Sequence, residues 1–177
     1  MLRNTVIAGF IAVVVSAVSA YSVWAEDARL TDPQIAHIAY TAGQIDVDAA
    51  QLALTKTENV DVRAFAELMA RDHAAVNDQA LALVKRLNVT PEANGTSTAL
   101  TKQAAETRAQ LEALSGGEFD RAYVESEVAY HRTVNDALRN ALIPSAQNAE
   151  LKALLETGLT LFQEHQAHAE HLAKMVK

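Results

Sequence analysis

Apolar residues recur at helical spacing along most of the chain beyond residue 30. In the clearest stretch, residues 60–87, a histidine, His73, stands where the pattern calls for an apolar side chain. This spacing predicts a long amphipathic helix with a buried stripe. A histidine at the midpoint of such a stripe is either a hydrogen-bonded core residue or a ligand. The apolar residues of the stripe are Phe65, Met69, Val76, Ala80, Leu83 and Leu87.

The same periodicity predicts three further amphipathic helices. The first opens on Thr31 or Asp32 as its cap, and Gln34 has the spacing to complete a capping box. The next is expected to end before Pro144, because the residue preceding a proline disfavours helical geometry. The last starts near Asn148 and is expected to run to the C-terminus. The predicted bundle helices are residues 31–56, 60–87, 118–142 and 148–177.

The connections between these helices predict their arrangement. A short break at Glu58 and Asn59 makes the first two an antiparallel pair. The second and third are joined by residues 88–117, which include a helical piece at residues 99–114 about 25 Å long. That length is enough to run back along the bundle. The sequence therefore predicts an all-α, up-down-down-up four-helix bundle with an extra helix in the long crossover.

Each predicted bundle helix has one polar residue on or beside its apolar stripe. His131 and His165 take the place that His73 takes on its helix, and Asp46 lies about 60° from the centre of its stripe. The height of each polar residue along the bundle can be counted from the nearest helix–helix turn at ~1.5 Å per residue. Counted in this way, Asp46 and His73 lie at similar heights, and His131 and His165 agree within about 8 Å. We expect the four side chains to share one layer in the middle of the core.

Imidazole and carboxylate groups are suitable ligands for zinc, iron, copper or manganese, and bundle cores commonly hold such sites. Asp72, Glu127 and Glu164 are candidates for orienting the rings or for adding ligands, and His168 for reaching the rim of the layer. The layer therefore predicts a site for a divalent metal. The expected ligands are Asp46, His73, His131 and His165.

Two alternatives to a metal site stay open from the residues alone. The layer could be a hydrogen-bonded polar core that fixes helix register in a non-enzymatic structural, stress or interaction module of the cell envelope. It could also hold a heme or another ligand, although no heme or nucleotide motif occurs. A di-iron oxidase is not expected, because non-ligands stand three residues before the histidines: Ala70, Val128 and Phe162.

Composition and charge narrow the function classes. Aspartate and glutamate outnumber lysine and arginine by 22 to 15, and no basic run occurs, which argues against nucleic acid as a partner. The chain has no cysteine, so disulfides and thiolate metal ligands are excluded. A glycine-rich phosphate loop and a nucleophile elbow are both missing, and nothing else in the sequence indicates catalysis.

The N-terminal residues have the layout of a secretory signal. Arg3 precedes an apolar run, and small residues lead to Ala25, after which cleavage is expected. The predicted division is a signal peptide at residues 1–25 and a bundle domain at residues 26–177. The alternative is an uncleaved anchor at residues 5–25, which would tether the domain to a membrane. Either case places the domain in the periplasm or outer cell envelope.

Three segments carry a resemblance to a known family. The runs VRAFAELMARDHAAVN (residues 62–77) and GGEFDRAYVESEVAYH (residues 116–131), with residues 159–169, resemble a ferritin-like bacterial domain of unknown function. Its members are often labelled outer-membrane or periplasmic proteins. The resemblance implies a ferritin-like fold, an envelope location, and recurring residues that match the three histidines and Asp46. In the family the acidic residue is usually glutamate, so aspartate here shortens the reach of that ligand by one methylene.

Overall fold

Every secondary-structure element in residues 30–176, the part of the chain that the computed structural model describes, is a helix. The predicted signal segment, residues 1–25, lies outside these residues. No described helix combines the length and apolar character needed to cross a membrane. The elements are α1 (Asp32–Lys56), α2 (Val60–Arg86), α3 (Gly95–Glu112), α4 (Gly116–Ala137), η2 (Leu138–Leu142), α5 (Ile143–Ser145) and α6 (Ala149–Leu172).

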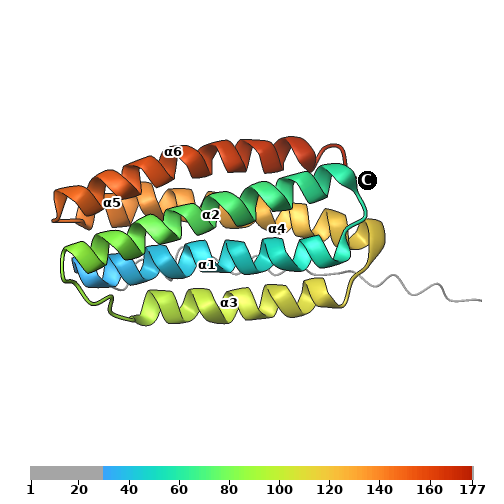
Figure 1. Ribbon diagram of the computed structural model, residues 1–177. Coiled ribbons are helices and arrows are strands. Elements are labelled where there is room, and N and C mark those ends of the chain that lie inside the picture. Colours follow the sequence, from blue (N-terminus) through green and yellow to red (C-terminus); the bar gives the residue numbers. More distant parts are fainter. Residues whose placement is uncertain (1–29, 177) are drawn as a thin grey trace, which may run out of the picture.

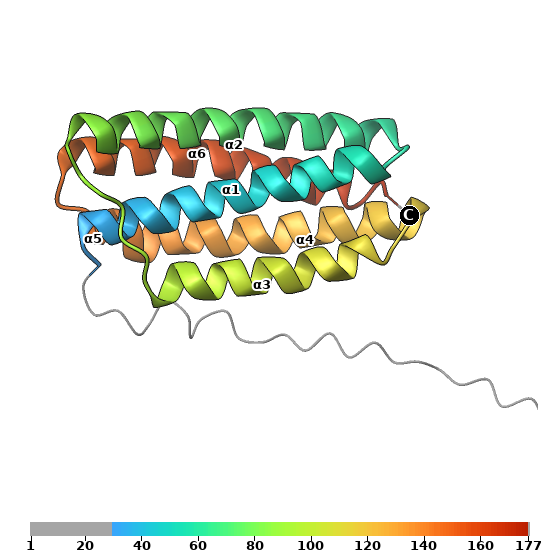
Figure 2. The same cartoon turned by 60° about the horizontal axis from the view of Figure 1, so that its bottom comes forward.

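The four long helices α1, α2, α4 and α6 lie side by side as a bundle (Figure 1). Followed along the chain, α1 and α6 run in one direction, and α2 and α4 run in the other. Helix α3 crosses back along the outside, packed against α1 and α4 (Figure 2). The predicted all-α class is confirmed. The observed helix directions follow the predicted up-down-down-up order, with α3 in the long connection.

Three helices start at capping side chains that can be identified in the sequence. Thr31 Oγ1 accepts a hydrogen bond from the Gln34 backbone N–H, and the Thr31 N–H donates to Gln34 Oε1, which completes the predicted capping box. Asn59 and Asn148 cap α2 and α6 through side-chain oxygens that accept from backbone N–H groups one turn ahead. These contacts satisfy donors that would otherwise lack a partner within the helix.

The start of α3 and the end of α6 differ from the prediction. Helix α3 begins at Gly95 instead of residue 99, because Asn94 caps it: Asn94 Oδ1 accepts from the Ser97 N–H, and Ser97 Oγ accepts from the Asn94 N–H. Helix α6 ends at Leu172 and not at the C-terminus, and turns follow it. The Asn–Gly pair at the start of α3 resembles a turn in sequence, but here it forms the helix N-terminus.

The end of α4 is the third correction. The chain stays helical through Pro144, first as the π-helical η2 and then as the short α5. Pro144 lies in the first turn of α5, where its missing N–H does no harm. Leu138 and Leu142 of η2 are both buried. Both leucines lie within the predicted helix, whereas α5, the part beyond its predicted end, buries none of its residues.

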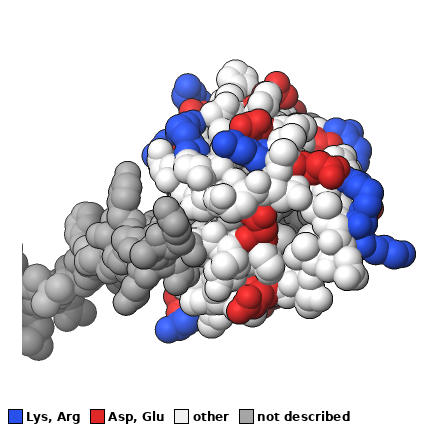
Figure 3. Space-filling model, turned by 90° about the vertical axis from the view of Figure 1, so that its left-hand side faces the viewer, with Lys and Arg blue, Asp and Glu red and all other residues white. Residues whose placement is uncertain are grey.

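The buried apolar residues form two clusters along the bundle. One contains Phe65 and Tyr123, and the other contains Ile38 and Leu138. Along each bundle helix, the predicted polar layer falls between the residues of these two clusters. On the end face shown in Figure 3, the described basic and acidic side chains are interspersed, without a large patch of one sign.

Candidate metal centre

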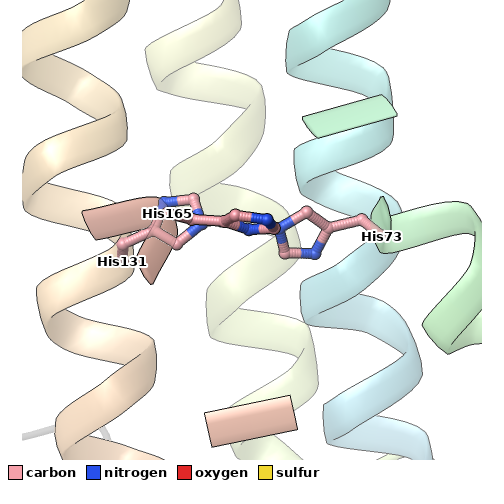
Figure 4. Close-up of side chains that lie close together, drawn as sticks. All are labelled: His73, His131 and His165. Carbon is pink, nitrogen blue, oxygen red and sulfur yellow. The ribbon is translucent and has the colours of Figure 1, made fainter. Parts of the chain in front are cut away.

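Three imidazole rings from three helices meet in the middle of the bundle (Figure 4). His73 on α2, His131 on α4 and His165 on α6 are each at most 2% exposed. One ring nitrogen from each lies within 4.8 Å of the others, and His73 Nε2 is 3.4 Å from His131 Nε2. The structure thus places the three predicted histidines at one level of the core.

Packing holds the rings in place. The Phe162 ring on α6 stacks on His73, with 4.6 Å between centroids and 10° between planes. His131 meets both of the other imidazoles edge-on, at centroid distances of 5.5 Å to His73 and 5.6 Å to His165. Because interiors pack at crystal-like density, such contacts leave each ring little freedom to rotate.

Hydrogen bonds assign the tautomers of two of these histidines. His131 Nδ1 lies 3.1 Å from the Glu127 backbone carbonyl, which can only accept, so Nδ1 carries the proton and Nε2 presents its lone pair. His165 Nε2 lies 3.1 Å from Asp72 Oδ2 and donates to that carboxylate, which leaves the lone pair on Nδ1. Burial acts against ionisation of Asp72, but hydrogen bonds from Arg71 and His165 lower its pKa below the ordinary value.

Two buried carboxyl groups complete the layer. Asp46 Oδ2 on α1 lies 3.5 Å from His73 Nε2, and Glu127 Oε2 on α4 lies 3.5 Å from His131 Nδ1. Asp46, Glu127 and His131 form a second group with ligand atoms within 4.8 Å of one another. Burial raises the pKa of Asp46, and the neighbouring Glu127 adds to the effect. Burial also raises the pKa of Glu127, to about 7.

The imidazoles are neutral at pH 7. Burial lowers the pKa of His131 to about 4, with a further contribution from His165. Burial, then His131 and His165, lowers the pKa of His73 well below its ordinary value. Burial also lowers the pKa of His165, against the opposing effect of Asp72. Neutral imidazole is the form that binds metal ions, so the lone pairs are available without loss of a proton.

Comparison with known proteins gives a family without an assigned function. A family model described as "Domain of unknown function (DUF4142)" matches residues 20–172. The chain belongs to the DUF4142 family. This confirms the family resemblance that the sequence motifs carry. No curated protein matches the chain.

One solved structure is similar to the DUF4142 chain. It is described as "Crystal structure of putative secreted protein DUF305 from Streptomyces coelicolor". The TM-score is 0.67 at 12% sequence identity, and the match covers 78% of this chain and 89% of the other. At that identity the similarity establishes the helical fold alone.

The polar layer of this DUF4142 chain is not a closed hydrogen-bond network. Two of its buried ring nitrogens, His73 Nδ1 and His165 Nδ1, have no hydrogen-bond partner among the described residues, whereas the Asp46 and Glu127 side chains hydrogen-bond to each other. A buried polar atom without a partner costs roughly 1–3 kcal/mol. Such atoms are uncommon in folded proteins and call for a specific explanation.

The structure places the other predicted site residues at different depths. Asp72 contacts His165, as expected of a residue that orients a ring. Glu164 is exposed, and its charge acts to raise the pKa of His165, so its role beside the rings stays a prediction. His168 is also exposed. Its ring packs edge-on against Phe65, a residue of the neighbouring apolar cluster, with 5.1 Å between the ring centroids. It lies outside the layer because three residues of helix rotate it away from His165.

Glu127 is more central than the sequence indicated. We predicted it as a partner of the histidines, but it is as deeply buried as the predicted ligands. The signal was present: Glu127 precedes His131 by four residues, which puts both on one face of α4. The stacking of Phe162 on His73 could not be predicted from residue spacing, because these residues belong to different helices.

Proposed function

We propose that this DUF4142 protein binds one divalent transition-metal ion through His73, His131, His165 and Asp46. The observation that carries the proposal is the convergence of three buried imidazoles, with 3.4 Å between His73 Nε2 and His131 Nε2. A tetrahedral metal with bonds of ~2.0–2.1 Å separates two ligand nitrogens by roughly 3.4 Å. The His73–Asp46 separation of 3.5 Å is compatible with the same geometry.

The hydrogen bonds of the layer support the proposal. Glu127 holds the outer nitrogen of His131 through its carbonyl, and Asp72 holds the outer nitrogen of His165 through its carboxylate. Metal-binding histidines are usually oriented in this way, through the ring nitrogen that faces away from the metal. Binding of the ion replaces the proton of the Asp46 carboxyl and gives a partner to His165 Nδ1, which otherwise has none among the described residues. Zinc, iron, copper and manganese all accept this donor set.

We also propose a domain type, a location and a class of partners for this protein. Residues 26–177 form a ferritin-like domain, exported by the signal at residues 1–25 to the periplasm or outer cell envelope. The directions of α1, α2, α4 and α6 support the ferritin-like label. The similarity to a structure described as that of a "putative secreted protein" supports export. The net charge of −7 supports partners other than nucleic acid. We assign no reaction to the site.

Metal binding is tested on the full chain without a histidine tag. Elemental analysis should find about one divalent ion per chain. Adding zinc, iron, copper or manganese to metal-free protein should raise the melting temperature, because an ion at 100 times its Kd stabilises the folded state by about 2.7 kcal/mol. His131→Gln should abolish both effects. His171→Gln, which changes an exposed histidine on α6, should preserve them.

The metal-free alternative predicts the opposite result. If the layer is only a hydrogen-bonded polar core, metal content will be far below one per chain and none of the four ions will shift the melting temperature. His73→Leu distinguishes the cases further. It removes a ligand from a metal site, whereas in a purely structural layer an apolar replacement of similar size is tolerated or stabilising.

A further inference from the structure

A cavity of about 40 Å³, partly open to solvent, lies along the bundle beside the polar layer. Each bundle helix contributes to its wall a residue one turn from the polar residue of that helix. These neighbours are Gly43 next to Asp46, Asn77 next to His73, Val134 next to His131, and Phe162 next to His165. One helical turn is ~5.4 Å, so the cavity occupies the next layer of the core.

Small residues and the π-helical segment create this space. Ala42 and Gly43 on α1, and Gly158 on α6, bring little or no side chain to the wall. Leu138 and Leu142 close the wall from η2, the π-helical turn that replaces the expected helix end. Single π-helical turns within α-helices occur frequently at functional sites. The cavity therefore follows from particular residues of this chain.

The chemistry of the wall is apolar with one exception. Its residues are alanine, glycine, valine, leucine, isoleucine and phenylalanine, apart from Asn77. Asn77 is only 6% exposed, and its Nδ2 has no hydrogen-bond partner among the described residues. No charged side chain of the described residues lines the space. An ion would have no counter-charge, and a buried water usually needs two to four polar partners.

We propose that this cavity binds a small uncharged apolar molecule of the size of dioxygen. On the same measure a single water needs ~10–15 Å³, so the cavity accommodates about three water-sized groups. A cavity that binds benzene or xenon is roughly 150 Å³, so this space is smaller than that one. The side-chain amide of Asn77 is the one polar group at the wall among the described residues.

The Phe162 ring forms the boundary between the cavity and the polar layer. It lines the cavity on one side and stacks on His73 at 4.6 Å on the other. The guest thus lies one aromatic ring away from the imidazoles. The cavity contains none of the proposed metal ligands, so this inference goes beyond the proposed metal site and succeeds or fails independently of it.

Xenon is the probe, because it is apolar, uncharged and easily detected. The full chain, metal-free and metal-loaded, is titrated with xenon while methyl resonances of Val134 and Leu138 are followed by NMR. We expect saturable shifts at both residues in each form. Dioxygen, added separately, should enhance the relaxation of the same methyl groups because it is paramagnetic.

Two variants reduce the cavity, and a matched variant does not. Ala42→Leu should abolish the xenon shifts by filling the space. Gly158→Ala should weaken xenon binding, since its Cβ would lie 3.4 and 3.7 Å from Phe162 ring atoms, in ordinary contact. Gly95→Ala is the control: a Cβ there meets nothing within 4 Å, so xenon binding should be unchanged.

Three results would overturn the proposal. The first is an absence of saturable xenon shifts at Val134 and Leu138 in the wild type. The second is persistence of wild-type shifts in folded Ala42→Leu, or in Gly158→Ala if the leucine variant does not fold. The third is a crystal structure in which ordered water bound to Asn77 fills the space. A protein that binds metal but no xenon would refute this inference alone.

Discussion

The side chains of the buried layer have pKa values that burial moves in opposite directions. Burial raises the pKa of Asp46, and that of Glu127 to about 7, whereas it lowers the pKa of His131 to about 4. In the metal-free protein each group is therefore driven towards its uncharged form. A divalent ion reverses this balance, because it stabilises the carboxylate and uses the imidazole lone pairs.

We expect His131 to make the metal-free protein less stable as the pH falls. Its pKa is about 4 in the folded state and 6.5 ordinarily, so between these values the unfolded chain binds the additional proton. The resulting loss of stability develops as the pH drops from about 6.5 through 4, and reaches about 3 kcal/mol. His131→Gln should remove most of it. Urea unfolding at a series of pH values measures the effect.

Glu127→Gln is the matched variant, because Glu127 changes the stability with pH in the opposite direction from His131. The pKa of Glu127 is raised from 4.5 to about 7, so its contribution to stability is complete below pH 4.5 and is lost as the pH rises through 7. This variant should remove the loss of stability that Glu127 causes between pH 4.5 and 7, and leave the slope of the profile below pH 4.5 unchanged. Identical pH profiles for the wild type and both variants would show that these groups are not buried as described.

Asp72 positions a ring that we propose as a ligand, and it lies at the edge of the layer. Asp72→Ala should weaken metal binding roughly 10–100-fold, because His165 then loses the acceptor that fixes its tautomer and orientation. Asp78→Ala, at an exposed position on the same helix, is the control. Competition with a chelator gives both dissociation constants. Equal values for the two variants would exclude an orienting role for Asp72.

At the scale of elements, helices α1 and α2 approach closely at Gly43. A Cβ built there would lie 2.3 Å from Asn77 Oδ1 and 3.0 Å from Asn77 Cγ, so a side chain at this position would displace the buried amide. Glycine at this point of α1 is therefore a packing requirement. Helix propensity alone would favour alanine by about 1 kcal/mol.

Gly43→Ala should consequently destabilise the fold by about 1–3 kcal/mol, despite the better helix propensity of alanine. The free energy of unfolding in urea measures the change, with Gly95→Ala as the control for the substitution itself. Adding Asn77→Ala should recover part of the loss, since the clashing amide is then absent. Equal stabilities for Gly43→Ala and Gly95→Ala would disprove the close approach.

Helix boundaries that depend on a few neighbouring residues could be predicted from the sequence, and one that depends on more could not. The cap at Thr31 and the starts after Asn59 and Asn148 were predictable, because each depends on residues within one turn. The end of α4 was not predictable. Pro144 alone favours a helix end before it, but the chain stays helical through α5, because a proline in the first helical turn costs no hydrogen bond.

At the scale of the whole molecule, the bundle contains two apolar clusters separated by a polar layer. Stripe position and distance to the turns predict one level for His73, His131 and His165, and the structure brings their rings together. The prediction succeeded because helical rise and rotation are regular enough to carry position over many residues. His168 lies outside the layer, because its angular position on α6 is just outside the buried sector.

The sequence by itself determined the existence and order of the bundle helices, the cap at Thr31, the four residues of the layer and the family to which the chain belongs. These features follow from periodicity and local hydrogen bonding, which neighbouring residues specify. Only the tertiary structure decided the tautomers of His131 and His165, the pairing of Asp46 with Glu127, and the cavity bounded by Phe162. Each of these depends on contacts between helices, set by how whole side chains pack together.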